Sequence, residues 1–336
     1  MNIYDIAKEA GVSIATVSRV MNKPEAVNVK TRDRVLQIMD RHDFSPKLGA
    51  SVQRPKELAF FTSTRSLPVE TSIISGIGEV AFAERMSVKL CALEDVPKKK
   101  EDLQAYFAEK GIGGAIFTTV PYTEEHFAEL ASAIPAVLIF NRLQSAKVPS
   151  IRADHRKGGY AAIQHLAAMG HAHIAIVDEF TSPDHYERLA GAREAAADCG
   201  LRDFGEEHLI RVRDLEDADR CAQIDHYLSR YPSTTALFVA NDHFVPTLYR
   251  HFRIKGVRIP EALSIVGADD VPGSADLFPP LTTIRQPVKQ MSMAAARYLI
   301  DRMQGAVHAT EPLDEVYDVQ LVVRASTRML DREARD

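Results

Sequence analysis

Short apolar runs alternate with longer amphipathic stretches from residue 58 to residue 266. Runs such as Leu58-Ala59-Phe60-Phe61 are continuous, as expected of strands that are buried on both faces. Strands that alternate with helices predict parallel sheets covered by helices on both sides. The alternation occurs in two series of similar size, so we predict two doubly wound lobes with a cleft between them. Ligands of such folds bind at the carboxyl ends of the strands. The expected strands are 58–61, 88–93, 114–118, 136–140, 174–177, 209–212, 236–239 and 263–266, and the expected helices are 73–86, 99–110, 124–132, 158–170, 187–199, 217–231 and 243–255.

The first 45 residues follow a different pattern, that of a small helical domain. Apolar residues at spacings of three and four predict a first helix that ends at Gly11, because glycine adopts a left-handed conformation without steric cost. Ser13 is expected to cap a second helix, and Asn28 a third. The expected core residues are Ile3, Ile6, Ala7, Ala10, Val17, Val20, Met21, Val35, Ile38 and Met39. Two short helices joined by a tight turn form the helix-turn-helix plan, whose second helix enters the major groove of DNA.

The outward residues of the second helix are suited to contacts with DNA. Ile14 and Ala15 could press on thymine methyl groups, and Arg19 could bind a guanine or a phosphate. We expect phosphate contacts from Asn2, Tyr4, Ser13, Thr16, Ser18, Asn22 and Asn28. Residues 1–55 contain nine Lys and Arg against six Asp and Glu, which gives +3, so the rest of the chain must carry −8 of the total of −5. A basic head on an acidic body is expected if only the head touches phosphates. The alternative is a three-helix packing module that binds no DNA.

A linker is expected at residues 46–56. Pro46 ends the third helix, and Pro55 ends a short segment that could form one or two helical turns. A helix of this length is marginal in water, so we expect it to order only against DNA or a second copy of the chain. The predicted domains are therefore a helix-turn-helix DNA-binding head at 1–45, a hinge linker at 46–56 and a two-lobed effector-binding and dimerisation body at 57–336.

Several motifs resemble one known family along nearly the whole chain. The segment from Asp5 to Asn22 has the pattern D-I-A-K-E-A-G-V-S-x-x-T-V-S-R-V-x-N, which closely resembles the head of the LacI/GalR family of bacterial repressors. Residues 186–191, 238–242, 265–270 and 279–287 resemble the effector-binding core of that family, in the family order. The resemblance implies an all-α helix-turn-helix head and a periplasmic-binding-protein-like α/β body, whose two parallel-sheet lobes are joined by crossing strands. It also implies a homodimeric transcriptional repressor of operator DNA, controlled by a small-molecule effector.

The linker departs from the pattern of this family at one position. In the family that the chain resembles, the linker pushes a Leu into the minor groove, and apolar wedges of this kind kink the duplex. Ala50 matches the small residue at the hinge contact, but the wedge position falls on Gln53, directly after Val52. Either Val52 takes the role of the wedge, or the DNA bends less, or this linker works differently.

Polar residues that follow the predicted strands are the candidate ligands of the cleft. Asn141 and Arg142, Arg188, Asn241 and Asp269 offer amides, guanidinium groups and a carboxylate, which suit the hydroxyls of a small sugar-like effector. Each residue alone could equally be a solvated loop end or a helix cap. The resemblance implies ligand contacts for Arg188, Asn241 and Asp269. Aromatic residues that the family often places in the cleft are absent at Leu67 to Glu70, Leu215 and Val288, so the pocket is expected to lack a stacking platform and to suit a smaller or more acidic ligand. The candidate substitutes are Arg65, Glu70 and Tyr186.

Other functional classes fit the sequence less well. Gly76 to Ala81 satisfies the dinucleotide pattern G-x-G-x-x-A, so the alternative is an NAD-dependent dehydrogenase on a two-lobed scaffold. That motif needs its glycines directly after a strand, whereas the clearer strand ends near Phe61. Histidine and cysteine spacings give no metal or disulfide pattern, so we expect no catalytic residue, cofactor or metal. The chain has no apolar run of membrane-spanning length and no signal segment, so we expect a cytoplasmic protein rather than an exported binding protein.

Overall fold

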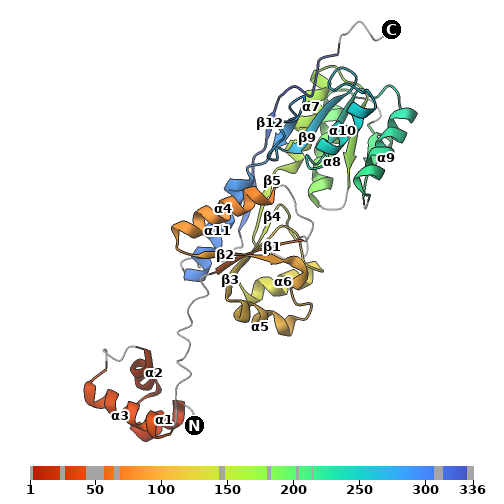
Figure 1. Ribbon diagram of the computed structural model, residues 1–336. Coiled ribbons are helices and arrows are strands. Elements are labelled where there is room, and N and C mark those ends of the chain that lie inside the picture. Colours follow the sequence, from red (N-terminus) through yellow and green to blue (C-terminus); the bar gives the residue numbers. More distant parts are fainter. Residues whose placement is uncertain are drawn as a thin grey trace. The chain divides into compact units, whose positions relative to one another are not determined.

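The computed structural model describes residues 3–22, 27–42, 57–63, 69–143, 148–179, 183–201, 204–213, 215–305 and 313–330. The chain divides into two units, Met1–Lys56 and Glu57–Asp336 (Figure 1). Among the described residues, no helix is both long enough and apolar enough to cross a membrane.

The first unit contains three helices, α1 (Ile3–Ala10), α2 (Ile14–Asn22) and α3 (Val29–Arg41). Gly11 has a φ of +65°, and the side chain of Ser13 accepts a hydrogen bond from Thr16 N at 3.2 Å, so the predicted turn and cap are confirmed. Asn28 Oδ1 accepts from Lys30 N at 3.0 Å at the start of α3. The predicted core is confirmed for Ile6, Ala7, Ala10, Val17, Val20, Val35, Ile38 and Met39, all of which are buried. The side chains of Ile3 and Met21 lie outside the described residues.

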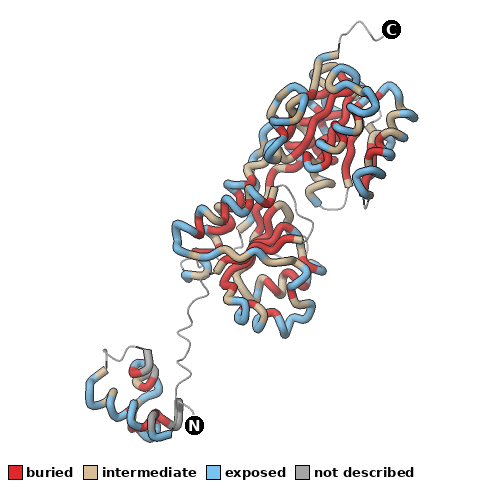
Figure 2. The backbone as a smooth tube through the Cα atoms, in the orientation of Figure 1, coloured by how far each residue is buried: buried red, intermediate tan, exposed pale blue. Residues whose placement is uncertain are grey.

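Lobe 1 of the second unit is built on a parallel sheet with the strand order β11-β5-β4-β3-β1-β2. Its strands are β1 (Glu57–Thr62), β2 (Ser87–Ala92), β3 (Ile112–Phe117), β4 (Ala136–Ile139), β5 (Ser150–Ala153) and β11 (Asp314–Tyr317). Successive residues of β1 face opposite layers of the core. Leu58 and Phe60 pack with helices α4 (Glu70–Ala83) and α11 (Val288–Gln304). Ala59 and Phe61 pack with α5 (Lys100–Lys110) and α6 (Glu124–Ala133). Both faces of β1 are therefore buried, as the continuous apolar run predicted (Figure 2).

Lobe 2 is a second six-stranded sheet with the order β12-β10-β9-β8-β6-β7. Its strands are β6 (Ile174–Asp178), β7 (Leu209–Arg211), β8 (Ala236–Val239), β9 (Ser264–Asp269), β10 (Thr282–Arg285) and β12 (Gln320–Val322), and only β12 is antiparallel to its neighbour among these described strands. Helices α7 (His155–Ala168) and α8 (Pro183–Asp198) cover one face. Helices α9 (Asp217–Arg230) and α10 (Val245–Ile254) cover the other. Short 3-10 turns lie at Leu93–Asp95 and Glu206–His208.

The chain passes between the lobes three times within the described residues. The first passage leads from β5 to α7 through Asp154, the second from β10 to α11 through Gln286 and Pro287, and the third from β11 to β12. Two of these passages are joined directly, because Asp154 N donates to Tyr317 O at 2.9 Å and Lys157 Nζ lies 2.7 Å from a carboxylate oxygen of Asp318. The predicted two-lobed architecture with crossing strands is thus confirmed.

The sequence did not predict every element. Strands β10, β11 and β12 and helix α11 were missed, because the expected alternation stopped at residue 266, and β5 was missed because its four residues form no apolar run. Helices α7 and α8 begin at His155 and Pro183, three and four residues earlier than expected. The dinucleotide alternative is wrong, because Gly76 and Gly78 lie in the middle of α4 rather than in a turn that follows a strand. Gly76 instead permits close packing, since a Cβ atom there would lie 2.5 Å from the carbonyl oxygen of Lys289 in α11.

Candidate DNA-binding helix and effector cleft

Helix α2 presents part of the predicted DNA-contacting surface. Ile14 is 41% exposed and Arg19 is also exposed, whereas Thr16 is half-buried and its hydroxyl lies 2.9 Å from that of Ser13. Both hydroxyls therefore also stabilise the start of the helix. Of the other predicted DNA contacts, Asn2, Ala50 and Gln53, together with Val52, lie outside the described residues, as do the side chains of Tyr4, Ala15, Ser18 and Asn22.

A cavity of about 310 Å³ lies between the two lobes of the second unit. Lobe 1 contributes residues at the carboxyl ends of its strands, including Thr62, Thr118 and Asn141. Lobe 2 contributes Asn241 after β8 and Asp269 at the end of β9. The cavity therefore occupies the edge at which parallel α/β sheets bind ligands. We call it the cleft.

Arg188 is a buried cation at the lobe 2 wall of the cleft. Its Nη1 donates to the carbonyl oxygen of Ala240 at 2.7 Å, and its Nη2 lies 3.5 Å from a carboxylate oxygen of Asp184. Nη1 is also 4.0 Å from Asp178. Burial alone would lower the pKa of Arg188, but the carboxylates of Asp184, Asp178 and Asp269 outweigh it and raise the pKa above its ordinary value. The guanidinium group is therefore permanently charged.

The position of Arg188 depends on close packing between α7 and α8. A Cβ atom on Gly159 would lie 1.9 Å from the carbonyl oxygen of Arg188, and one on Gly191 would lie 1.8 Å from that of Arg156. Only glycine fits at such distances, so the two helices meet with their backbones in contact. This contact places the first two turns of α8 against the start of α7 at the cleft.

Asp269 lies opposite Arg188 at the end of β9 with a φ of +112°, a conformation that is strained for any residue except glycine. Its Oδ1 accepts a hydrogen bond from Gln286 Nε2 at 2.6 Å. Burial raises the pKa of Asp269 to about 6, although Arg188 and Gln286 act in the opposite direction. Asn241 is fixed differently, since its side-chain oxygen accepts from His243 N at 2.9 Å. Strained backbone that is held by such bonds is typical of functional sites.

Two histidines line the cleft that the sequence did not assign to it. His155, the first residue of α7, is 3% exposed, and its Nδ1 lies 3.3 Å from Arg188 Nη2. Burial, helped by Arg188, lowers the pKa of His155 to about 4. His185 Nδ1 lies 2.8 Å from Asp178 Oδ1. Burial lowers its pKa, but Asp178 and Asp184 raise it more, so the net shift is upward. His185 was missed because α8 was expected to begin at residue 187.

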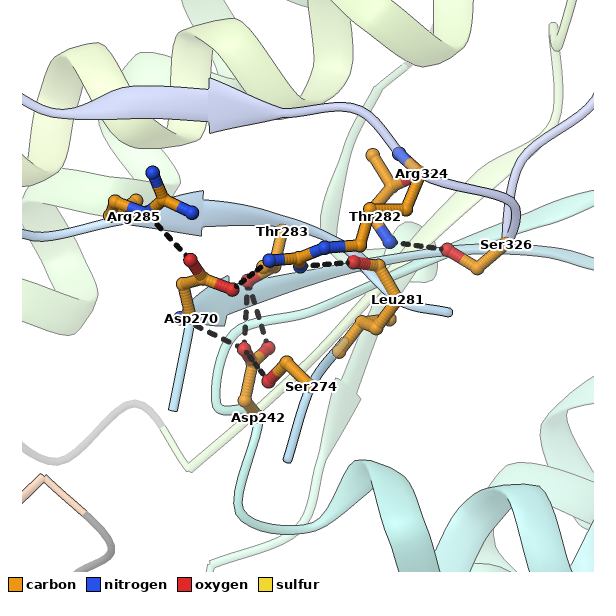
Figure 3. A network of polar contacts seen from close by, with 9 residues as sticks. All are labelled: Asp242, Asp270, Ser274, Leu281, Thr282, Thr283, Arg285, Arg324 and Ser326. Atoms are coloured by element: carbon orange, nitrogen blue, oxygen red, sulfur yellow. Dashed lines mark hydrogen bonds and ion pairs between the residues drawn. The ribbon is translucent and has the colours of Figure 1, made fainter. Parts of the chain in front are cut away.

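A polar network behind the cleft holds the loop after β9 (Figure 3). Asp242 is buried and accepts hydrogen bonds from Thr283 Oγ1 at 2.8 Å, Ser274 Oγ at 2.9 Å and Asp270 N at 2.9 Å. Burial, with a contribution from Asp269, raises the pKa of Asp242 to about 8. Asp270 lies between two guanidinium groups, 2.6 Å from Arg285 Nε and 2.7 Å from Arg324 Nη2. The network thus holds Asp242 and Asp270, the residues that directly follow Asn241 and Asp269.

Several predicted cleft residues lie elsewhere. Arg142 is exposed, and it is not among the described residues that line the cavity. Glu70 is buried at the start of α4 and accepts a hydrogen bond from the Thr62 hydroxyl, so it supports the wall rather than forming it. Tyr186 is 55% exposed and also lies outside the described lining. Leu215 and Val288 pack in apolar cores, and Arg65 lies outside the described residues.

That the cleft lacks an aromatic stacking platform stays a prediction, although one aromatic residue lies at the cavity and packs against the core of lobe 1. Phe140 lines the cavity directly after β4, and its backbone has a φ of +77°. This unusual conformation turns the chain at the end of the strand. A residue of this kind gives no signal in the sequence, because nothing there distinguishes it from the apolar strand that it follows.

Two family models match the chain. The model described as bacterial regulatory proteins, lacI family, matches residues 2–47. The model of a periplasmic binding protein-like domain matches residues 163–327. The first match covers the helix-turn-helix, and the second covers most of lobe 2.

Relatives and solved structures match over almost their full length. The HTH-type transcriptional regulator DegA of Bacillus subtilis (strain 168) is 30% identical over 338 residues, covering 98% of both chains. The HTH-type transcriptional repressor PurR of Photobacterium profundum is 27% identical over 335 residues, covering 98% of this chain and 99% of the relative. The structure of a complex of the transcriptional regulator CelR with cellobiose has a TM-score of 0.70 at 26% identity, covering 97% of this chain and 99% of the other. The lac repressor dimer bound to operator and the anti-inducer ONPF has a TM-score of 0.67 at 26% identity, with coverages of 98% and 99%. The chain therefore belongs to the LacI family of bacterial regulatory proteins.

Proposed function

We propose that the protein is a sequence-specific transcriptional repressor whose affinity for operator DNA is set by a small, sugar-like effector bound in the cleft. The observation that supports this most directly is the convergence of Arg188, Asn241 and Asp269 with Asn141 of the other lobe around one cavity. A ligand that contacts both lobes stabilises the arrangement of the lobes that fits it. The similar regulator CelR was solved with cellobiose. As a regulator of transcription, the protein acts in the cytoplasm, on the chromosome.

The head reads DNA through α2. Ile14, Ala15 and Arg19 contact base edges in the major groove, an assignment supported by the exposure of Ile14 and Arg19. Phosphate contacts from the head set its register on the duplex; they come from Asn2, Tyr4, Ser13, Thr16, Ser18, Asn22 and Asn28. Ala50 and either Val52 or Gln53 contact the minor groove through the linker.

A second copy of the chain binds against α4 and β2 to form a homodimer. Ile74 and Phe82, eight residues apart on α4, are 41% and 86% exposed, and Leu90 of the edge strand β2 is 60% exposed. Glu57, where the linker enters the body, pairs in register with Ser87 at the start of β2. An interface on this edge therefore brings two linkers together, as two heads on a twofold operator require. The similar lac repressor was solved as a dimer on its operator.

Effector binding is coupled to the linkers through the passages between the lobes. Gln286 donates to Asp269 in the cleft and stands in the passage from β10 to α11. His155 follows the passage through Asp154 directly. A ligand that changes the cleft thus changes the passages, and with them the position of β1 and its linker. Couplings of this kind typically amount to about 1–3 kcal/mol.

DNA binding in the presence of candidate effectors tests this function. Fluorescence anisotropy would compare labelled duplexes from the promoters that flank the gene with scrambled competitors of equal length. We expect tight binding to one partly palindromic duplex, and a change of its affinity on addition of one member of a panel of sugars. Equal binding to all duplexes, with and without the panel, would contradict the proposal.

A further inference from the structure

We infer that the cleft selects an uncharged, hydroxyl-rich effector and rejects the same compound when it carries a phosphate or a carboxylate. This inference rests on the proposed function, since it concerns the ligand of the cleft described above. Two independent observations on the described residues carry it: the balance of charges around the cavity, and the hydrogen-bonding groups that have no partner there.

Carboxylates outnumber cations around the cleft. Glu179, Asp184 and Asp269 line the cavity, and among the described lining residues Arg188 is the one permanent cation. His185 also lines the cavity, and its raised pKa favours a positive charge, but that charge is paired with Asp178, 2.8 Å from its Nδ1. An anion in this cavity would meet like charges at short range, where burial weakens the screening by water.

The cations near the cleft are already paired. Arg188 is held by Ala240 O, Asp184 and the ring of His155, as described above. Arg220 Nη2 lies 2.6 Å from Glu179 Oε1, and its Nε donates to Leu215 O at 2.8 Å. A phosphate or carboxylate would have to displace these partners to obtain a counter-charge, and a buried carboxylate left behind without its cation would be destabilised.

His155 does not supply a positive charge either. Arg188 can only donate hydrogen bonds, so Nδ1 of His155 is the acceptor of this pair and the ring proton is on Nε2. Protonation of Nδ1 would place two cationic groups 3.3 Å apart in a buried site. His155 is therefore a neutral donor.

The cleft also contains hydrogen-bonding atoms that a ligand could satisfy. Asn141 Nδ2 donates to Thr118 O at 3.4 Å and Gln286 Nε2 to Asp269, which fixes the orientation of both amides. Their oxygens, Asn141 Oδ1 and Gln286 Oε1, have no hydrogen-bond partner among the described residues. A hydroxyl group can donate to these two oxygens, whereas an ionised carboxylate or phosphate offers acceptors alone. Hydroxyl groups are thus the complementary ligand chemistry.

This selectivity places the effector in a reaction sequence. Kinases and oxidising enzymes convert a neutral sugar into a phosphate or a sugar acid. A cleft with these properties responds to the compound that such an enzyme consumes, and not to the charged product. The regulator then reports the supply of the neutral substrate.

Inorganic phosphate provides a test that does not depend on knowing the effector. The full-length protein, labelled with carbon-13 in its histidine rings, would be titrated with phosphate at constant ionic strength and pH, with NMR detection of His155 and His185. We expect no saturable shift of these signals in the wild type. Asp184→Asn and Glu179→Gln, which release Arg188 and Arg220, should each produce a saturable shift. The control Glu194→Gln removes the same charge from an exposed ion pair between Glu194 of α8 and Arg156 of α7, and it should behave as the wild type. A saturable shift in the wild type would overturn the inference, as would the absence of a shift in both cleft variants with unchanged thermal stability.

Matched ligands give a second measurement. Thermal shift assays would compare aldoses with their phosphates and their aldonic acids. We expect a neutral sugar to bind at least about tenfold more tightly than its charged derivatives, a difference of about 1.4 kcal/mol. Binding of a charged derivative with equal or higher affinity would refute the selectivity while leaving the effector function intact. Loss of operator preference in the DNA assay would instead refute the proposed function.

Discussion

Gly159 and Gly191 lie at the crossing of α7 and α8, each against the backbone of the opposite helix, with space for no side chain at either position. Gly159→Ala or Gly191→Ala should therefore force the helices apart and lower the free energy of unfolding by about 3 kcal/mol, the upper range for overpacking. Because Gly159 faces the carbonyl of Arg188, effector binding should weaken as well. Chemical denaturation measures the first effect. Ala197→Ser, on the exposed face of α8, is the control and should change stability by less than about 0.5 kcal/mol. Wild-type stability of both alanine variants would contradict this packing.

The buried acid Asp242 should make stability depend on pH. Its pKa rises from 3.8 to about 8 on folding, so the folded state retains a proton that the unfolded chain loses. The contribution of Asp242 to the free energy of unfolding is therefore largest at low pH. It decreases as the pH rises toward 8, by at most about 1.4 kcal/mol per pH unit.

Denaturation between about pH 7.5 and 9 tests this dependence, because His155 and His171, whose pKa values are lowered to about 4 in the folded state and are about 6.5 in the unfolded chain, are largely neutral in both states there. Asp242→Asn should remove most of the slope. His185, with its raised pKa, contributes a slope of the same sign, and His185→Gln measures that part separately. If Asp242→Asn leaves the change of the free energy of unfolding with pH unaltered, Asp242 is not the source of this dependence.

Arg19 should carry specificity rather than general affinity for DNA. It is exposed on α2, and a guanidinium that binds a guanine contributes about 1–3 kcal/mol of discrimination. Arg19→Ala should weaken operator binding by this amount and binding to random duplexes much less. Anisotropy titrations at one salt concentration measure both. Equal losses on the two duplexes would mean that Arg19 binds only phosphate.

The dimer interface should be sensitive to charge on α4. Phe82→Asp puts a carboxylate on an 86% exposed apolar residue of the proposed contact surface, and should convert the dimer to a monomer with unchanged helix content. Size-exclusion chromatography with light scattering measures the mass. Val316→Asp, on a 52% exposed residue of β11 at the opposite edge of the same sheet, should leave the dimer intact. A dimeric Phe82→Asp protein would move the interface elsewhere.

Asp269 should be required for the response to the effector. Asp269→Asn keeps the shape and one acceptor for Gln286 but removes the charge. We expect basal operator binding to persist and the change in affinity on adding the effector to fall at least about tenfold, equivalent to about 1.4 kcal/mol. A full response in this variant would place the ligand elsewhere.

Periodicity predicted most of the fold but not the passages between the lobes. Runs such as Leu58 to Phe61 are buried on both sides and are recognisable as strands for that reason. Ser150–Ala153 and Asp314–Tyr317 contain charged or polar residues and few apolar ones, because they lie near or at the edge of the sheet. Their pairing depends on partners more than 150 residues away in the chain, such as Asp314 opposite Ser150, which no local pattern can specify.

The cleft was predictable to the extent that its residues follow strands. Asn241, Asp269 and Asn141 line the cavity because the ends of parallel strands meet at one edge. Arg142 does not line it, whereas Phe140, whose φ of +77° turns the chain directly after β4, and Asn141 do. His155 and His185 required the true starts of α7 and α8, and helix starts are the least certain feature of a periodic pattern.

Lobe 1 is assembled from two widely separated stretches, residues 57–153 and 288–317, so it has no continuous coding segment of its own. Synthesis from the ribosome delivers all of lobe 2 except β12 and the segment that follows it before α11 and β11 emerge. Until then, the apolar surface of β1 and α4 that α11 covers has no partner within the nascent chain. Truncation before residue 288 would therefore leave the core of lobe 1 open. An exchange of lobe 1 with that of a relative by a single crossover would have the same effect, so functional chimaeras need at least two junctions.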